Sequence, residues 1–491
     1  MNHFCPMSCN RSRRQLFVLL FLIAVTWSSV TLANPAEEKT KRRRKNRKAD
    51  ATEKAAGPRN YRSKNFIMHT DLPKKEAQDL LKRMETMLRL ISRYWGAPCR
   101  KTIECYVVKD LQKWPPGSLH PRGVQSIATG GGVTLSQSQA LVANQQIVDA
   151  DAVVYAVAER GVPLHEAVHA YCALTFGRTG PTWYSEGMAE MGNYWRQNDS
   201  SVKLEPIVLH YLQNAETKKL SEIVYGAQIS GDSWREYAWR WALCHLLANN
   251  PNYANRFRPL GLALLNKKNV DFKQVYGAMF QEIVFEYEFF IRHLDQGLRS
   301  DLISFDWKRK FRKSRGNSRV RARTLAGRGW QPSGLMVDAE IEYQYSVEGH
   351  WKLAKKGPEL DADGNVILPP PTSEPAGNDN VVASAKPAAE KPDDASGGNE
   401  APSAGQLVGI VLIYDEDAGY RLSKPFNLGR YGTFTAPARG NLYLRCNDKW
   451  NEIADNSGTI SASIKEQGKG VPLKEPNAEV LRTSKLKSTN K

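Results

Sequence analysis

Apolar and polar positions in the first part of the chain predict alternating strands and helices. Residues 73–96 carry apolar side chains at helical spacing between a proline and a glycine, which indicates one amphipathic helix. Short apolar stretches at 65–72 and 103–108 predict strands on either side of it, and a third strand is expected at 130–135. This order of elements indicates an α+β domain over residues 61–300.

The second half of this domain is predicted to be mostly helical, from about residue 152 to 298. The segment 236–250 reads as one helix, and 272–294 as one or two more. The expected architecture is therefore a short sheet with helices packed against it.

Residues 328–466 have a different pattern, because apolar and polar residues alternate there in short runs. Such runs are typical of an all-β sandwich. The runs lie at 334–353, 406–417, 431–437, 440–448 and 458–465. A Pro/Ala/Ser/Asp-rich insertion at 369–405 has no core-forming pattern, and the polar tail at 467–491 is also expected to be disordered.

Residues 1–33 have the layout of a secretory signal peptide. Basic residues precede an apolar run at Leu16–Val25, and the small residue Ala33 follows. An uncleaved membrane anchor is the alternative, although the run is shorter than the ~20 residues that a span needs. Either reading predicts an exported protein, secreted or held in the periplasm or cell envelope, and no later segment is apolar enough to span a membrane.

The 491 residues carry a formal net charge of +18, much of it in two basic runs. One lies in a polar arm at 34–60 that is expected to be disordered. The other, at 307–323, falls in a predicted linker at 301–327. Neither run belongs to a recognisable nucleic-acid-binding fold, so no nucleic-acid partner is expected. Anionic envelope polymers, or solvent alone, are the expected surroundings.

Five cysteines lie beyond the predicted signal peptide, so at least one thiol is free or shared between chains. Cys99 and Cys105 are the nearest pair for a disulfide in an exported protein. Cys172 and Cys244 lie on predicted helices and are expected to be buried apolar residues.

The segment 161–195 carries the clearest candidate chemistry. His165 and His169 are one helical turn apart and face the same way, so their imidazoles can bind one metal ion. Glu166, at the neighbouring edge, is placed to act as a base on a water molecule. Two histidines and a glutamate form a known catalytic zinc set, and Glu186 or Glu190 can supply the third ligand. The other would orient a histidine. The alternative is a helix that carries two histidines and binds no metal.

This pattern, HEAVH followed by WYSEGMAE, resembles the gluzincin zinc metallopeptidases and is closest to the peptidase-MA-like proteins. The resemblance implies that Glu186 is the third zinc ligand and that Glu190 steadies the first histidine. It also implies a catalytic role for Tyr237 at the start of a later helix, for which a packing aromatic is the alternative. The implied reaction is peptide hydrolysis by a water that Glu166 deprotonates. The strand at 130–135 is expected to pair with the substrate backbone.

The stretch 440–464 holds a second candidate site. Asp448, Asp455 and Asn456 offer oxygen ligands in a loop between two strands, and Ca²⁺ prefers such ligands. Ordinary turn chemistry is the alternative. The stretch is similar to the carboxy-terminal part of PA-IL-like galactose-binding lectins, which implies that these three residues bind calcium and that calcium binds a sugar.

The sequence thus predicts an exported zinc-dependent peptidase with an accessory β-domain for which carbohydrate is the candidate ligand. The alternative is a non-proteolytic envelope- or glycan-binding protein with a degenerate zincin domain. Peptide or protein substrates and carbohydrate are the expected partners.

Overall fold

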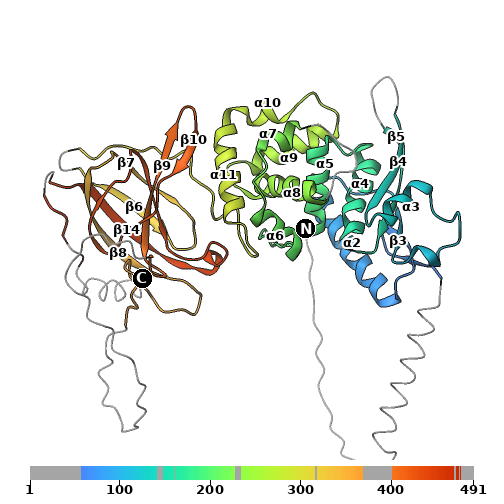
Figure 1. The fold of residues 1–491 in the computed structure, drawn as a ribbon, viewed down its shortest axis with the longest axis horizontal. Helices are drawn as coiled ribbons and strands as arrows, with labels where there is room; N and C mark the ends of the chain where they lie inside the picture. The colour runs from blue at the N-terminus through green and yellow to red at the C-terminus, as the bar shows by residue number, and fades with distance from the viewer. Residues whose placement is uncertain are drawn as a thin grey trace, which may run out of the picture. The chain divides into compact units, whose positions relative to one another are not determined.

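The computed structural model describes residues 57–140, 147–159, 161–226, 234–315, 318–368, 401–468, 471–474 and 476. All of them belong to one unit, Gly57–Lys491. They form an α+β N-terminal part and a β-rich C-terminal part (Figure 1). The predicted signal peptide, most of the basic arm, most of the insertion and much of the predicted tail lie outside the described residues.

Five strands of the N-terminal part form one mixed sheet in the order β1-β2-β3-β5-β4. The strands are β1 (Arg59–Arg62), β2 (Phe66–Thr70), β3 (Ile103–Val108), β4 (Gly132–Ala140) and β5 (Ile147–Val157). Strands β2, β3 and β5 run parallel, whereas β1 and β4 are antiparallel to their neighbours. Strand β4 pairs with β5 alone and is therefore an edge of the sheet.

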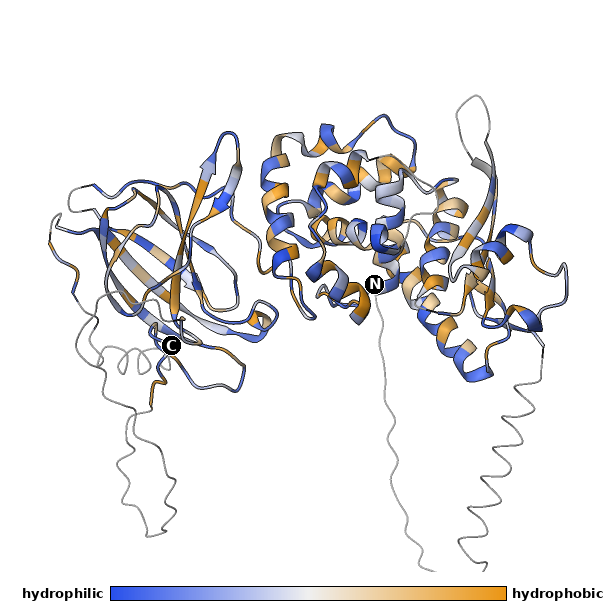
Figure 2. Ribbon diagram, in the orientation of Figure 1, coloured by the Kyte–Doolittle hydropathy of each residue, from blue (hydrophilic) through white to orange (hydrophobic). Residues whose placement is uncertain are grey.

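Helices make up the rest of this part. They are α2 (Lys74–Trp95), α3 (Pro121–Ala128), α4 (Val162–Phe176), α5 (Thr182–Tyr194), α6 (Pro206–Asn214), α7 (Leu220–Tyr225), α8 (Trp234–Asn249), α9 (Ala254–Leu265), α10 (Phe272–Tyr276) and α11 (Phe280–Arg292), with short 3₁₀ turns η1 (Leu111–Lys113) and η2 (Gly277–Met279). Most of them carry bands of hydrophobic and hydrophilic residues, as helices that bury one face do (Figure 2). None of the helices in the described residues is long and apolar enough to cross a membrane.

The predicted helix at 73–96 is confirmed. Helix α2 ends at Gly96, whose φ of 72° is the left-handed conformation that glycine adopts readily. The helical region was predicted to begin near residue 152. That start is wrong, because Ala152 to Val157 belong to β5. A strand buried against helices reads as a continuous apolar run, which periodicity alone does not separate from a helix.

Helix α4 is buried on nearly every side, and two glycines of α5 let other helices approach closely. A Cβ atom on Gly192 would lie 2.4 Å from Cγ2 of Val168 on α4. A Cβ atom on Gly187 would lie 2.7 Å from the carbonyl oxygen of Arg240 and 2.4 Å from Sγ of Cys244, both on α8. Because neither glycine has a side chain, α5 sits close to both helices at once.

The C-terminal part has two antiparallel sheets that share one buried core. One has the order β10-β9-β13-β7, with β11 also paired to β9, and the other β12-β8-β14-β6. The strands are β6 (Val320–Leu325), β7 (Gln331–Val337), β8 (Glu342–Lys352), β9 (Leu407–Asp415), β10 (Gly419–Leu422), β11 (Phe426–Asn427), β12 (Tyr431–Thr435), β13 (Gly440–Cys446) and β14 (Ser457–Glu466), and the turn η3 (Ile453–Asp455) precedes β14. Inward-facing residues of both sheets, such as Val411 and Ile460, form the core.

Three predicted boundaries differ from the structure. The basic arm was expected to extend to residue 60, but Arg59 and Asn60 begin β1 and pair with β2. The linker at 301–327 contains strand β6, because the alternation in VRARTL buries every second residue against the core. In the predicted tail, Leu473 is buried and its N–H donates to Oε1 of Gln344 on β8.

The first residues of the predicted linker are also held by the helices. Glu286 on α11 is buried and accepts hydrogen bonds from the N–H of Phe305 at 2.7 Å and from Nε1 of Trp307 at 3.1 Å. The hydroxyl of Tyr253 donates to the same carboxylate. Burial raises the pKa of Glu286, although these hydrogen bonds oppose the shift. The start of the linker is therefore a fixed part of the structure.

The five cysteines of the described residues are all free. Cys99 and Cys105 form no disulfide, and Cys105 lies in the core on β3. Cys172 and Cys244 are buried, as the sequence predicts.

We expect Gly187→Ala to lower the free energy of unfolding by about 1–3 kcal/mol, because the added methyl group has no room between α5 and α8. Urea unfolding followed by circular dichroism measures the change. The matched control is Gly277→Ala, since a Cβ atom there would lie 3.6 Å from its nearest neighbour, Cγ of Lys273. Equal stability of the two variants would contradict the close approach of the helices.

Candidate metal centre

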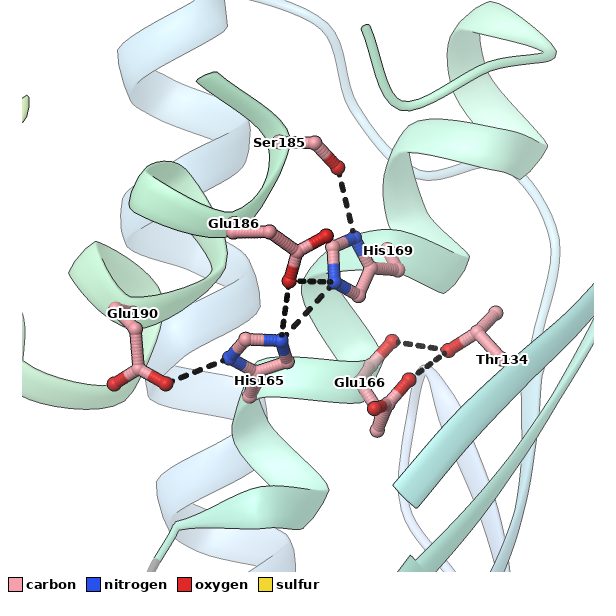
Figure 3. A network of polar contacts seen from close by, with 7 residues as sticks. All are labelled: Thr134, His165, Glu166, His169, Ser185, Glu186 and Glu190. Carbon is pink, nitrogen blue, oxygen red and sulfur yellow. Dashed lines mark hydrogen bonds and ion pairs between the residues drawn. The ribbon is translucent and has the colours of Figure 1, made fainter. Parts of the chain in front are cut away.

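Three side chains from two helices point their ligand atoms at one another (Figure 3). His165 and His169 come from α4 and Glu186 comes from α5. Nε2 of His165 lies 3.1 Å from Nε2 of His169 and 3.2 Å from Oε2 of Glu186, and Nε2 of His169 lies 3.4 Å from the same oxygen. In the described residues this is the one group of three or more His, Cys, Asp or Glu side chains close enough to hold a metal ion together.

The size of this triangle fits a tetrahedral zinc ion. Zinc lies about 2.0–2.2 Å from nitrogen and oxygen ligands, so two ligands of a tetrahedron are about 3.3–3.5 Å apart. The three distances in the structure fall at or slightly below this range. Two imidazole nitrogens and a carboxylate oxygen are also a donor set that zinc prefers. The residues present therefore fit the ion that the sequence predicts.

The other nitrogen of each histidine has its own partner. Nδ1 of His165 lies 2.8 Å from Oε1 of Glu190, one turn after Glu186 on α5. Nδ1 of His169 lies 3.3 Å from Oγ of Ser185. An imidazole that donates its Nδ1–H in this way presents the lone pair of Nε2 to a metal. Glu190 and Ser185 thus set the tautomer and the ring orientation of the two histidines.

Neighbouring charges shift the pKa values of His165 and Glu186. Burial by itself disfavours the imidazolium form of His165, but hydrogen bonds and charge from Glu186 and Glu190 outweigh it and raise the pKa of His165 well above its usual value. Burial also disfavours the ionised form of Glu186, but the charge of His169 and hydrogen bonds from both histidines hold the pKa of Glu186 well below its usual value. The carboxylates of Glu186 and Glu190 thus favour positive charge at this point, which a bound cation would also supply.

Glu166 is held from the opposite direction by the edge strand. The hydroxyl of Thr134 on β4 lies 2.8 Å from Oε2 of Glu166 and 2.8 Å from its main-chain oxygen (Figure 3). A Cβ atom on Gly132, two residues earlier on the same strand, would lie 2.7 Å from Cγ of Glu166. Strand and helix are thus close enough here to fix the Glu166 side chain.

A cavity of about 540 Å³ opens beside these residues. Its lining includes His165, Glu166 and Glu190, the glycines at 130–132, and Tyr237 of α8. The Tyr237 ring centroid is 5.3 Å from that of His165. Of the three ligand residues only His165 lines this cavity, so a molecule in the cavity would lie beside His165 and Glu166.

Of the residues predicted from the sequence, His165, Glu166, His169, Glu186, Glu190 and Tyr237 all come together at this centre. The sequence analysis missed Ser185 and Thr134. Ser185 precedes a predicted ligand, but nothing in its neighbours indicates which way its hydroxyl points. Thr134 could have been found, because it shares a strand face with Gly132 in the predicted strand at 130–135.

The second candidate site is assembled in part. Oδ2 of Asp448 accepts a hydrogen bond from Nδ2 of Asn456 at 2.8 Å. Oδ1 of Asn456 is buried and finds no hydrogen-bond donor within the described chain. Asp455 is exposed at the end of the turn η3, directly before Asn456. Calcium binding by the three residues stays a prediction.

No protein-family model matches the chain, and no curated protein matches it. Among solved structures, a similar one is the N-terminal domain of EclA, described as a PllA-like lectin. It is 14% identical, the match covers 30% of this chain and 95% of that chain, and the TM-score is 0.19. A similarity at this TM-score supports no argument about this protein.

We expect Glu190→Gln to weaken zinc binding by about 10- to 100-fold, because the amide accepts the Nδ1–H bond of His165 without a charge. Titration of the full chain with zinc against a chelator measures this affinity. Glu216→Gln, on an exposed loop, is the matched control and should bind zinc like the unaltered protein. Unchanged affinity in Glu190→Gln would contradict the orienting role, and absence of zinc binding by the unaltered protein would contradict the centre.

Proposed function

We propose that the N-terminal domain is a zincin-like domain of the gluzincin type that hydrolyses peptide bonds. The observation that carries the proposal is the triangle of His165, His169 and Glu186, with tetrahedral spacing and a cavity beside it. The HExxH spacing and the EGMAE segment support the same conclusion from the sequence. We further propose that the protein acts after export, which rests on the predicted signal peptide alone.

Zinc at this centre would polarise a peptide carbonyl and lower the pKa of a water molecule. Glu166 then serves as the base that takes a proton from the attacking water and later delivers it to the leaving amine. The Thr134 hydroxyl lies 2.8 Å from both Oε2 and the main-chain oxygen of Glu166, which leaves Oε1 for the water. Glu190 keeps His165 in the tautomer that leaves Nε2 free.

Tyr237 is the proposed donor to the oxyanion. Its position on the cavity wall beside His165 supports this role. The close packing of α8 on α5 at Gly187 supports it as well, since α8 carries Tyr237 one turn before the contact. A phenol hydroxyl aimed at the developing negative charge stabilises the transition state more than the substrate.

Strand β4 is the proposed platform for the substrate. It is an edge of its sheet, and the glycines that lead into it line the cavity. An extended peptide can add to such an edge through main-chain hydrogen bonds, which places a scissile bond near Glu166. Glycines at this point leave space for the peptide backbone.

The alternative is a non-proteolytic envelope- or glycan-binding protein with a degenerate zincin domain. The two proposals differ in what Glu166 does, because a binding domain needs no base beside its metal. Carbohydrate binding by the C-terminal sheets stays a prediction of the sequence resemblance.

We expect Glu166→Gln to lower peptide hydrolysis by about 10²- to 10⁴-fold while zinc remains bound, because the amide cannot accept a proton. Cleavage of a mixed library of quenched fluorescent peptides by the zinc-loaded full chain measures activity, and elemental analysis measures zinc. Glu216→Gln again serves as the control. Hydrolysis that persists in Glu166→Gln, or is absent from the zinc-loaded unaltered protein, would favour the binding-protein alternative.

For Tyr237→Phe we expect kcat to fall by about 10²-fold with little change in KM, since only the hydroxyl that meets the oxyanion is lost. The same peptides give both constants. Tyr225→Phe, whose ring is exposed on α7, controls for the loss of a phenol elsewhere. A rise in KM at unchanged kcat would assign Tyr237 to substrate binding instead.

A further inference from the structure

A basic surface distant in sequence from the metal centre follows strand β6 and the segment before it. We call it the basic edge, and it consists of Arg309, Lys310, Arg312, Arg319, Arg321, Arg323 and Arg328. All seven side chains are exposed, and none forms an ion pair with a carboxylate of the described residues. Asp306 lines one of the cavities along this surface, but the basic side chains outnumber it, so such a surface favours an anionic partner.

Cavity space runs along the basic edge on both halves of β6. A cavity of about 450 Å³ is lined by Arg309, Arg319 and Arg321 among others. A second, of about 510 Å³, is lined by Arg309, Arg323 and Leu325 among others. Because both cavities share Arg309, the strand is flanked by room for a ligand along most of its length.

Some main-chain groups of β6 also face away from its partner strand. Strand β6 is the edge of its sheet and pairs with β14 alone. Alternate residues of an antiparallel strand turn their N–H and C=O groups toward or away from the partner strand. The Gln331 side chain bonds both main-chain groups of Leu325, at 2.9 Å each, so Leu325 faces away from β14. Arg323 and Arg321, two and four residues earlier in an unbroken register, face the same way.

The same two arginines put their side chains on the outer face of the sheet. Burial alternates along β6, with Arg321 and Arg323 exposed and Ala322 between them buried. Residues two apart on a strand are separated by about 6.5 Å. An extended peptide with an acidic residue at every second position repeats at the same distance, so its carboxylates can face both guanidinium groups.

Charged residues on an edge strand can also serve only to prevent aggregation. That role needs charges on the strand itself. Here Arg309 and Lys310 come from a separate segment and line the same cavity as Arg321. The aromatic side chains that line the two cavities, Phe305, Phe311 and Trp330, are buried or half-buried, so they offer no platform for stacking nucleic-acid bases.

We propose that the basic edge binds an extended acidic peptide, which adds to β6 as a further strand. The outward N–H and C=O groups of Arg321 and Arg323 bond the peptide main chain, and their guanidinium groups pair with carboxylates at alternate positions. An anionic polysaccharide or polynucleotide can neutralise the positive charge of the basic edge. It has no peptide main chain, however, and so cannot pair with β6 as a strand. The inference is independent of the metal centre and of its proposed reaction.

Fluorescence anisotropy with the full chain at low salt tests the proposal. The probe is a fluorescein-labelled peptide of about ten residues in which Glu and Thr alternate. The control probe is the same peptide with N-methylated glutamates. It has the same charge but lacks the N–H groups that would bond β6. We expect the N-methylated peptide to bind at least about tenfold more weakly.

Variants test the arginines. Arg321→Glu/Arg323→Glu should weaken binding of the Glu–Thr peptide by at least about tenfold, and Arg321→Ala/Arg323→Ala is the milder version of it. The matched control is Arg421→Glu/Lys424→Glu, an equal change of charge at exposed positions outside the basic edge, which should change binding by less than about twofold. Thermal unfolding checks that each variant folds.

Several outcomes would overturn the proposal. Equal binding of the two peptides would mean that the surface responds to charge alone, without strand addition. Absence of peptide binding would assign the arginines to protection of the edge. Binding of only a sulfated polysaccharide or a single-stranded oligonucleotide, offered in parallel titrations, would identify a different class of partner.

Discussion

The structure of the candidate site depends on one constraint, the convergence of two imidazole nitrogens and one carboxylate oxygen at 3.1–3.4 Å from one another. Such atoms carry lone pairs, so their approach in a buried place requires protons or a cation between them. A proton on Nε2 of His165 can lie between that atom and Oε2 of Glu186, but it leaves Nε2 of His169 without a partner of its own. A divalent cation at the proposed metal centre would satisfy all three atoms at once.

Backbone packing makes this convergence possible. Gly192 lets α5 approach α4, and Gly187 lets α8 approach α5, so the ligands, the orienting Glu190 and Tyr237 are held by one group of helices. On the other side, Gly132 brings β4 against Glu166. The elements that carry the chemistry are therefore in contact at the places where a side chain is missing. Precise placement of this kind is what a catalytic centre needs, because small displacements of reacting groups cost much of the rate.

The chain presents two edge strands with different properties. Strand β4 leads into a cavity lined by carboxylates and histidine, whereas β6 is lined by arginines. Both edges can accept an extended peptide through the main chain, but their side chains select different charges. Under the two proposals, the N-terminal part acts on a peptide and the C-terminal part binds one.

The sequence by itself determined the features that depend on local spacing. The i, i+4 histidines, helix α2 with its glycine stop, and the alternating runs of the C-terminal strands all follow from contacts between near neighbours. Tertiary structure decided what depends on long-range packing. It brought Ser185 to Nδ1 of His169 and Thr134 to Glu166, two contacts that the sequence analysis missed, whereas the resemblance had already implied the roles of Glu186 and Glu190. It also placed β6 at an edge, where a basic segment reads in sequence as a linker. Sequence periodicity shows which residues share one face of a helix or strand. It does not show which other element packs against that face, so these outcomes depended on tertiary structure.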